Sequence, residues 1–229
     1  AVPATAFKEL DLTSIPPEER TAVFHSSGAS EQKPSRHFHC AESLAVYEAS
    51  LWAWFEQNVL WSAGSLPASS VETRGRAALA PIYLTPPPEQ TPHSSLVHMF
   101  EIVWQKLGGA SVFASRSEWD GRLGNDGAWT LDFEAVLAAV TGARDTCHPS
   151  LIFGTAFSFV HLLDYLAEKN LKFALPPGSR VMETGGYKNR SRSMSKVELH
   201  ALITERLGVP RENIPFEYGM SELMFQAYD

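Results

Sequence analysis

The chain has 229 residues, of which 44% are hydrophobic, and it carries a net charge of −7. This length allows one large domain or two small ones with a substantial buried core. The acidic balance argues against a general DNA- or RNA-binding protein, because neutralising phosphates requires a basic surface. The presence of only two cysteines excludes a disulfide scaffold and favours a reducing cytoplasm.

No apolar run reaches the roughly 18 residues needed to cross a bilayer, so we expect no membrane span. The chain begins without a methionine and stops directly after a motif-like stretch, EYGMSELMFQAYD. We therefore expect it to be a fragment of a longer protein.

A β-like run, Val23 to His25, ends at Ser26 and is followed by the polar sequence SSGASEQKPS. Two interpretations compete. The segment is either a solvated surface loop or a cradle for an anion, built from backbone N–H groups, hydroxyls and Lys33. We expect residues 26–33 to form a loop between two strands.

The middle of the chain shows alternating helical and strand patterns. Apolar spacing predicts helices over residues 41–61, over residues 96–107 with a stop at Gly108, and over residues 131–140 with a stop at Gly142. Short apolar runs predict strands at residues 80–85 and 112–114, and a Gly/Asp-rich stretch at 120–129 predicts a surface turn.

The last eighty residues read as strand, helix, strand, helix, strand. The strands are expected at residues 151–153, 180–183 and 213–217. The first helix is expected at about 157–169, and the second begins at the capping box Ser195–Glu198 and ends at Gly208. This order predicts an α/β fold with a parallel sheet and crossover helices.

Ligands of open parallel sheets bind at the carboxyl ends of the strands. The segments that follow these three strands are FGTAF, TGGYKNRSR and EYGMSE, and all three contain glycine and polar residues. The second belongs to a basic stretch, in which Glu183 is the single acid among Arg180, Lys188, Arg190, Arg192 and Lys196. This stretch suits a polyanionic ligand, and the competing interpretation is a solvated basic loop.

Taken in order, these segments resemble those of the adenylate-forming superfamily. SSGASEQKPS resembles its Ser/Thr/Gly-rich phosphate loop, and EYGMSE resembles its later YGxTE motif. VPATAFKEL, FGTAFSFVHLLDYL, ETGGYKNRSR and EYGMSEL are similar to the acyl-protein synthetase family, which includes the fatty-acid-activating component of the bacterial bioluminescence system. The resemblance extends over nearly the whole chain.

The resemblance implies that residues 1–229 are part of the large N-terminal ATP- and acyl-binding domain, and that the mobile C-terminal domain is absent. It implies a ligase that uses ATP and Mg²⁺ to convert a carboxylic acid, such as a fatty acid, into an acyl-adenylate. The acyl group then passes to a thiol of an acceptor protein or of coenzyme A. Without the mobile domain, we expect this fragment alone to be inactive.

The resemblance also assigns roles to individual residues. Glu222 is the expected magnesium ligand and, with Ser221 and Lys33, belongs to the expected catalytic set. The residues expected to bind the nucleotide are Ser26, Ser27, Gly28, Ala29, Ser30, Gly185, Gly186, Tyr187, Tyr218, Gly219 and Met220. The residues assigned to the carboxylic acid substrate are His93, His98, Phe153 and Gly154.

The phosphate loop departs from the family pattern, because it lacks the Thr-Thr-Gly core and Glu31 adds a negative charge. This departure leaves a second interpretation open, in which the chain is a non-catalytic relative that acts as a partner-binding module. Ordinary packing is the alternative role for His93 and His98.

Other candidates favour structural roles. His37, His39 and Cys40 lack a second ligand pair, so we do not expect a zinc site. Cys147 and His148 are neighbours in sequence, which does not orient them as a nucleophile and base. His161 and Asp164, three residues apart on a helix, are interpreted as a structural pair.

Overall fold

A mostly parallel β-sheet forms the centre of the computed structural model, which describes residues 6–26, 34–60, 80–108, 110–117, 129–187, 190–220 and 225–228. Its six strands lie in the order β10-β9-β8-β7-β3-β4. Neighbouring strands are parallel, except that β10 runs antiparallel to β9. The strands are β3 (Ala80–Tyr83), β4 (Val112–Phe113), β7 (Ser150–Thr155), β8 (Arg180–Thr184), β9 (Phe216–Met220) and β10 (Phe225–Tyr228).

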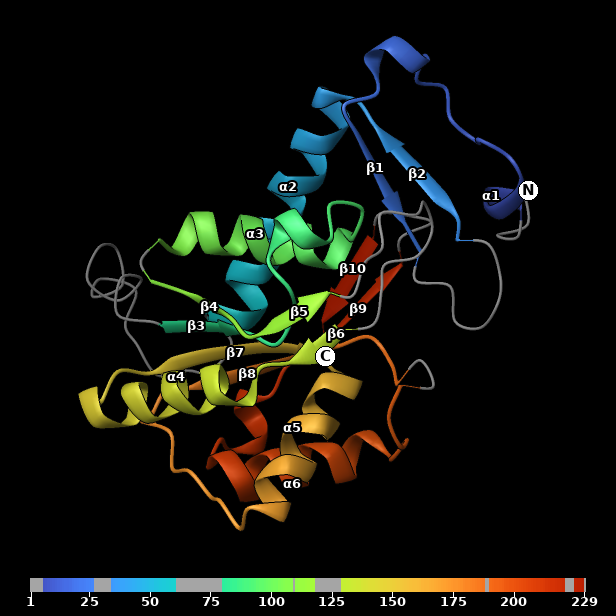
Figure 1. Cartoon of the computed structure of the whole chain (residues 1–229). Helices are drawn as coiled ribbons and strands as arrows, with labels where there is room; N and C mark the ends of the chain where they lie inside the picture. The colour runs from blue at the N-terminus through green and yellow to red at the C-terminus, as the bar shows by residue number, and fades with distance from the viewer. Residues whose placement is uncertain are drawn as a thin grey trace.

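Helices cover both faces of this sheet (Figure 1). One face carries α2 (Ala41–Phe55), which continues as a wider π-helical turn (Glu56–Leu60), and α3 (Ser95–Leu107). The other face carries α4 (Phe133–Thr146), α5 (Ala156–Glu168) and α6 (Lys196–Leu207). The first helix, α1 (Ala6–Glu9), precedes the sheet, and short 3-10 turns lie at Pro17–Glu19, Pro88–Gln90 and Arg211–Asn213.

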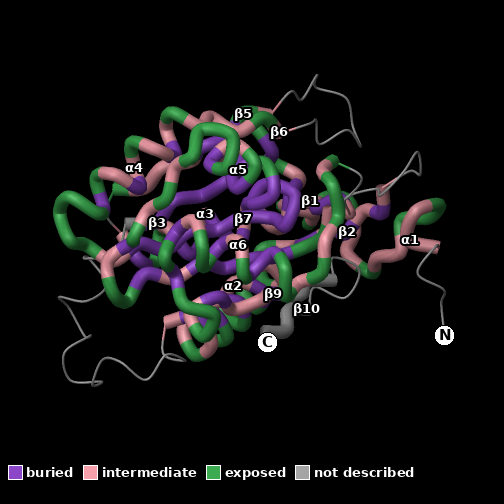
Figure 2. The backbone as a smooth tube through the Cα atoms, turned by 90° about the horizontal axis from the view of Figure 1, so that it is seen from below, coloured by how far each residue is buried: buried purple, intermediate pink, exposed green. Residues whose placement is uncertain are grey.

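Two hydrophobic cores follow from the alternation of side chains along the strands. Ile82, Ile152 and Val181 face α4, α5 and α6. Their chain neighbours Tyr83 and Met182 face α2 and α3 instead. Figure 2 shows the resulting buried interior along the central strands.

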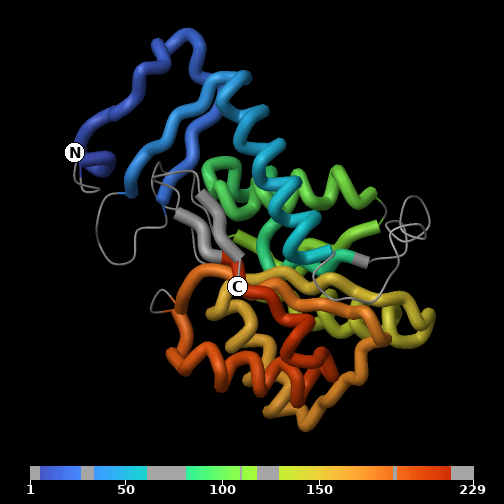
Figure 3. The backbone as a smooth tube through the Cα atoms, turned by 180° about the vertical axis from the view of Figure 1, so that it is seen from behind, coloured from blue at the N-terminus to red at the C-terminus, as the bar shows by residue number. Residues whose placement is uncertain are grey.

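Two small hairpins flank the sheet. Strands β1 (Ala22–His25) and β2 (Arg36–His39) pair antiparallel, as do β5 (Ser115–Ser117) and β6 (Trp129–Leu131). The β1–β2 hairpin stands beside α2 in both Figure 1 and Figure 3. It is fixed to the segment before α3 by a 2.9 Å backbone hydrogen bond from His25 N to His93 O.

Most of the expected elements are confirmed. The parallel strands of the last eighty residues and their two crossover helices are present, and so are the helix ends at Gly108 and Gly208, where φ is +70° and +71°. Ser195 and Glu198 form the expected capping box of α6.

Three boundaries, in two elements, were clearly wrong. The helix expected at residues 131–140 is α4, which begins at Phe133 because Leu131 belongs to β6, and which continues through Gly142 to Thr146. An added Cβ at Gly142 would meet no heavy atom within 4 Å, and the helix ends instead where Cys147 adopts φ +55°. The last parallel strand begins at Phe216 rather than at residue 213, because Arg211–Asn213 forms a 3-10 turn.

Cys40 and Cys147 are both free thiols. Within the described ranges, no helix is long and apolar enough to span a membrane.

Candidate functional site at the carboxyl edge of the sheet

Strands β7, β8 and β9 end at one edge of the sheet, because they run parallel. Thr155 of β7 lies in register with Thr184 of β8, and Thr184 lies in register with Glu217 of β9. A row of three polar residues therefore crosses the end of the sheet. It stands directly before the α5 N-terminus, Gly185 and Tyr218, so the three segments singled out in the sequence converge here.

Thr155 is fixed by the helix that follows it. Its hydroxyl accepts a 3.3 Å hydrogen bond from Ser158 N and lies 2.8 Å from the Ser158 hydroxyl. These contacts cap α5, since the first N–H groups of a helix have no partner within it. Thr155 is fully buried, so its role is to set the start of α5.

The segment after β8 opens with two glycines that have different roles. Gly185 has φ +64°, a conformation that residues with a Cβ rarely adopt. Gly186 is open, because among the described residues no heavy atom lies within 4 Å of an added Cβ. Tyr187 then anchors the segment by donating a 2.9 Å hydrogen bond to the carbonyl of Met194.

The basic stretch is tied to α5. His161 Nε2 bonds to the Arg190 carbonyl at 2.9 Å, and Arg192 binds Asp164 with its closest contact at 2.7 Å. His161 and Asp164 thus each contact the loop, rather than pairing with each other as expected. Asp164 neutralises one of the positive charges, which reduces the local excess available to an anion.

A buried carboxyl group completes the row. Glu217 is 2% exposed and accepts a hydrogen bond from the hydroxyl of Thr184, which is 3% exposed. Burial raises the pKa of Glu217 to about 7, although the hydrogen bond from Thr184 acts in the opposite direction. This group changes its charge near neutral pH.

The β1–β2 hairpin leads into and out of the expected phosphate loop. Ser26 N bonds to Ser35 O, and Ser35 N bonds to the Ser26 hydroxyl, both at 3.0 Å. The hairpin therefore closes at Ser26 and Ser35, and residues 27–33 between them lie outside the described residues.

The substrate candidates His93 and His98 connect this hairpin to the helices. His93 Nδ1 bonds to Val23 O at 3.1 Å, and its ring stacks on His25 with centroids 4.7 Å apart. His98 Nε2 lies 2.9 Å from a carboxylate oxygen of Glu48 on α2. Both histidines thus have packing partners, and their contact with a substrate remains a prediction.

Phe153 and Gly154 contribute to the packing of β7. Phe153 is fully buried and stacks on Tyr83 with a centroid distance of 4.9 Å. A Cβ on Gly154 would come within 3.1 Å of Leu84 and Phe159, so β7 approaches its neighbours closely at this point. A substrate role for either residue stays a prediction.

Several predicted site residues cannot be placed. Lys33, Ser27, Gly28, Ala29, Ser30, Lys188, Ser221 and Glu222 lie outside the described residues. Tyr218, Gly219 and Met220 are described only as backbone of β9. The magnesium assignment of Glu222 therefore rests on the sequence motif alone.

The described residues contain no group of three or more His, Cys, Asp or Glu side chains that would hold a metal ion. His37 and His39 instead bond to the hydroxyls of Ser35 and Ser43, at 2.9 and 3.1 Å.

The sequence places Thr184 and Glu217 at the start of two strand-end segments, but neither side chain was assigned a role in the site. The available signal was an acidic residue inside a strand pattern, immediately before the YGMSE motif. Their pairing depends on the register of two strands 33 residues apart, which the sequence does not show.

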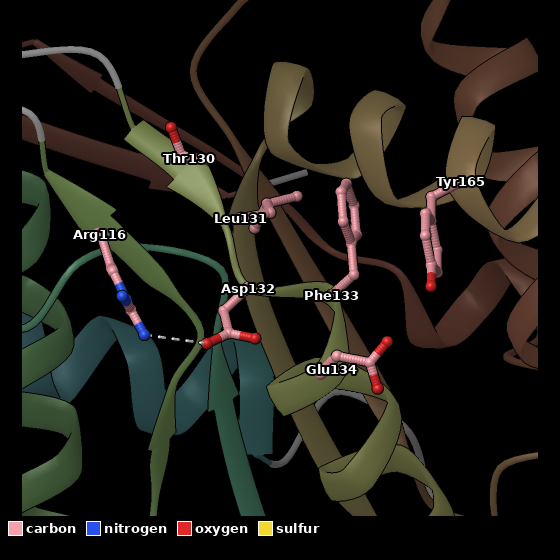
Figure 4. A pocket seen from close by; sticks show the side chains of 7 residues that line it. All are labelled: Arg116, Thr130, Leu131, Asp132, Phe133, Glu134 and Tyr165. Carbon is pink, nitrogen blue, oxygen red and sulfur yellow. Dashed lines mark ion pairs between the residues drawn. The ribbon is translucent and has the colours of Figure 1, made fainter.

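A pocket of about 380 Å³ lies elsewhere, between the β5–β6 hairpin, α4 and α5 (Figure 4). Phe133 and Tyr165 stack face to face in it with centroids 4.2 Å apart, and Arg116 lies 3.7 Å from Asp132. None of its lining residues belongs to the strand-end row.

No protein-family model matches the chain, and no curated protein matches it. Its structure is similar to that of a long-chain-fatty-acid–CoA ligase (FadD1) from Archaeoglobus fulgidus, with a TM-score of 0.51 and 11% identity over 92% of this chain and 33% of that one. Further similar structures are a 2-hydroxyisobutyryl-CoA ligase in complex with 2-HIB-AMP and CoA, and the amide bond synthetase McbA from Marinactinospora thermotolerans. The 2-hydroxyisobutyryl-CoA ligase has a TM-score of 0.49 and 14% identity over 91% of this chain and 37% of its own. McbA has a TM-score of 0.47 and 16% identity over 93% of this chain and 30% of its own.

The chain spans about a third of the length of each of these structures. It therefore has the fold of the corresponding part of a long-chain-fatty-acid–CoA ligase.

Proposed function

We propose that this chain forms the ATP- and acyl-binding part of an adenylate-forming ligase. The enzyme activates a carboxylic acid and transfers the acyl group to a thiol, either of an acceptor protein, as in the acyl-protein synthetases, or of coenzyme A. The observation that carries the proposal is the convergence of three glycine-bearing segments at the carboxyl edge of β7, β8 and β9. Ligands of open parallel sheets bind at such an edge.

The arrangement suits a nucleotide. Among the described residues, no heavy atom lies within 4 Å of a Cβ added at Gly185 or Gly186, which leaves room for a base, and the residue type of Tyr218 suits stacking on adenine. The Ser/Gly-rich residues 26–33, with Lys33, supply hydroxyls, backbone N–H groups and a positive charge for the β- and γ-phosphates.

In the proposed reaction, a carboxylate oxygen attacks the α-phosphorus of ATP and the bond to the β-phosphate oxygen breaks, which releases pyrophosphate. The thiol then attacks the acyl carbonyl, loses its proton to solvent and displaces AMP. Glu222 would hold Mg²⁺, and the ion would supply positive charge to neutralise the phosphates. Holding the acid and the α-phosphate together is the main contribution of the fold, since such positioning is worth about 7–11 kcal/mol.

The test is exchange of labelled pyrophosphate into ATP by the natural polypeptide that contains this chain. A panel of fatty, aryl and small polar acids identifies the substrate class, and GTP in place of ATP is the control. Exchange that depends on both ATP and one class of acid is the expected result. Tight binding of a partner protein without exchange by any acid would favour a non-catalytic binding module.

A further inference from the structure

Thr184 and Glu217 join β8 and β9 at the positions where the two expected nucleotide-binding segments begin. Thr184 is followed by Gly185, and Glu217 is followed by Tyr218. The Cα atoms of consecutive residues are about 3.8 Å apart, so each member of this pair fixes the first residue of one segment. The hydrogen bond between the two side chains therefore sets the distance between the segments.

The pair faces α2 and α3. Val181 and Met182 of β8 point into opposite cores, and Glu183 reaches His200 on the α6 side. Thr184 must consequently point to the opposite face. The pKa of Tyr47 on α2 agrees with this orientation, because burial raises it first and the charge of Glu217 raises it further.

Glu217 has no basic partner among the described residues. Tyr47 faces it from α2 and Thr184 binds it from β8. Glu48, the other carboxylate that acts on Tyr47, is paired with His98 of α3. A buried carboxylate without a cation is costly, so Glu217 takes up a proton readily.

We propose that Glu217 is a positioning residue of the nucleotide site, and that it is protonated when ATP is bound. This inference rests on the proposed function. Through Thr184, Glu217 holds the Gly185–Gly186 segment against the Tyr218–Gly219 segment. A negative charge at this position would repel a polyphosphate bound beside these segments, whereas the protonated carboxyl group keeps the hydrogen bond without the repulsion.

Proton binding by Glu217 and ATP binding are thermodynamically linked, and this linkage determines whether ATP affinity rises or falls with pH. If ATP prefers the protonated form, ATP affinity falls as pH rises through the titration of Glu217. A like charge about 10 Å away, at an effective dielectric constant of about 20, changes affinity on the order of tenfold.

The experiment measures the Kd of Mg-ATP by calorimetry from pH 6 to pH 8. It uses the natural polypeptide that contains this chain, its Glu217→Gln variant, and Glu205→Gln as a control at an exposed position. Because ATP itself titrates in this range, we compare the two proteins at each pH and take the Kd of the wild type divided by the Kd of Glu217→Gln. We expect this ratio to rise on the order of tenfold between pH 6 and pH 8. The Kd of the wild type divided by the Kd of Glu205→Gln should not change with pH.

Two further measurements keep the proposal falsifiable. Adenosine, which has no phosphates, is expected to bind with a ratio that does not change with pH. Thr184→Val, which removes the donor, is expected to move the midpoint of the ATP titration to higher pH, and Thr184→Ser to restore it. This pair carries the test if Glu217→Gln fails to fold.

The outcomes separate the two claims. If ATP binds but the wild-type to Glu217→Gln ratio stays constant with pH, the role of Glu217 is wrong and the proposed function stands. If neither protein binds ATP at any pH, both claims fail.

Discussion

Glu183 of β8 and His200 of α6 hold each other inside the core, with Oε2 and Nε2 3.1 Å apart and side-chain exposures of 4% and 0%. The next residue, Thr184, binds Glu217 on the opposite face of the sheet. The carboxyl end of β8 is thus attached to α6 on one face and to β9 on the other. This double attachment stiffens the support from which the Gly185–Gly186 segment extends.

Removing one partner of the Glu183–His200 pair should destabilise the fold. We expect His200→Phe to lower the free energy of unfolding by about 3–5 kcal/mol, the range observed when a buried pair loses one member. The double variant Glu183→Met/His200→Phe should recover much of this loss, because no buried carboxylate then lacks a partner. Urea unfolding measures both, with Glu205→Gln as an exposed control that should change little. If the double variant loses as much free energy of unfolding as the two single variants lose together, the pairing is contradicted.

Two glycines should respond to alanine in opposite directions. Gly208 has φ +71°, and a Cβ there would lie 3.0 Å from Ala174 Cα, so Gly208→Ala should destabilise the fold by at least about 1–2 kcal/mol. Gly142 lies within α4 with open space around it, so Gly142→Ala should stabilise by about 0.5–1 kcal/mol. Thermal unfolding of the two variants side by side tests this prediction. Equal effects of the same sign would show that one of the two backbone conformations is wrong.

The buried His25 should make the protein less stable in mild acid. Burial, and then the charges of His93, Arg36 and His37, lower the pKa of His25 from 6.5 to about 4. Below pH 6.5 the unfolded chain takes up this proton and the folded protein does not, so the free energy of unfolding falls as pH decreases from about 6.5 to 4.

The variant His25→Phe should reduce this pH dependence, whereas His148→Gln, at an exposed position, should not. Urea unfolding at a series of pH values gives the slopes. An unchanged slope in His25→Phe would mean that the pKa of His25 is not lowered in the folded protein, contrary to this prediction.

Glu222 should carry the magnesium dependence of the proposed reaction. Glu222→Gln keeps the shape of the side chain and removes its charge, and loss of a metal-ligand charge costs several kcal/mol at the transition state. We expect acid-dependent pyrophosphate exchange to drop by at least about a hundredfold and to require more Mg²⁺. The control is Glu212→Gln, at an exposed position in the 3-10 turn before β9. Activity of Glu222→Gln within about twofold of the wild type would exclude the metal role.

Local signals in the sequence predict the elements whose ends are determined locally. The capping box of Ser195 and Glu198 and the positive φ of the glycines at positions 108 and 208 are local features, so the boundaries of α3 and α6 were predictable. Gly142 was misleading because a glycine inside a helix costs only about 1 kcal/mol, which packing of α4 against the sheet offsets.

The contacts that organise the site were not predictable. Thr184 meets Glu217 only because β8 and β9 pair in one register, and His161 contacts Arg190 only because the loop folds back over α5. Such contacts join residues about 30 positions apart, beyond the reach of periodicity and capping rules. The parallel sheet predicted that the three segments meet at one edge, but not which side chains bond there.

We propose above that this chain belongs to an enzyme that cleaves ATP between the α- and β-phosphates to activate a carboxylic acid. The most direct measurement is a single-turnover reaction of the natural polypeptide with ATP, Mg²⁺ and the acid selected by the exchange assay, analysed by mass spectrometry. We expect an acyl-adenylate and an equal amount of pyrophosphate, both absent without the acid. Formation of ADP and phosphate instead, or of no acid-dependent product, would contradict it.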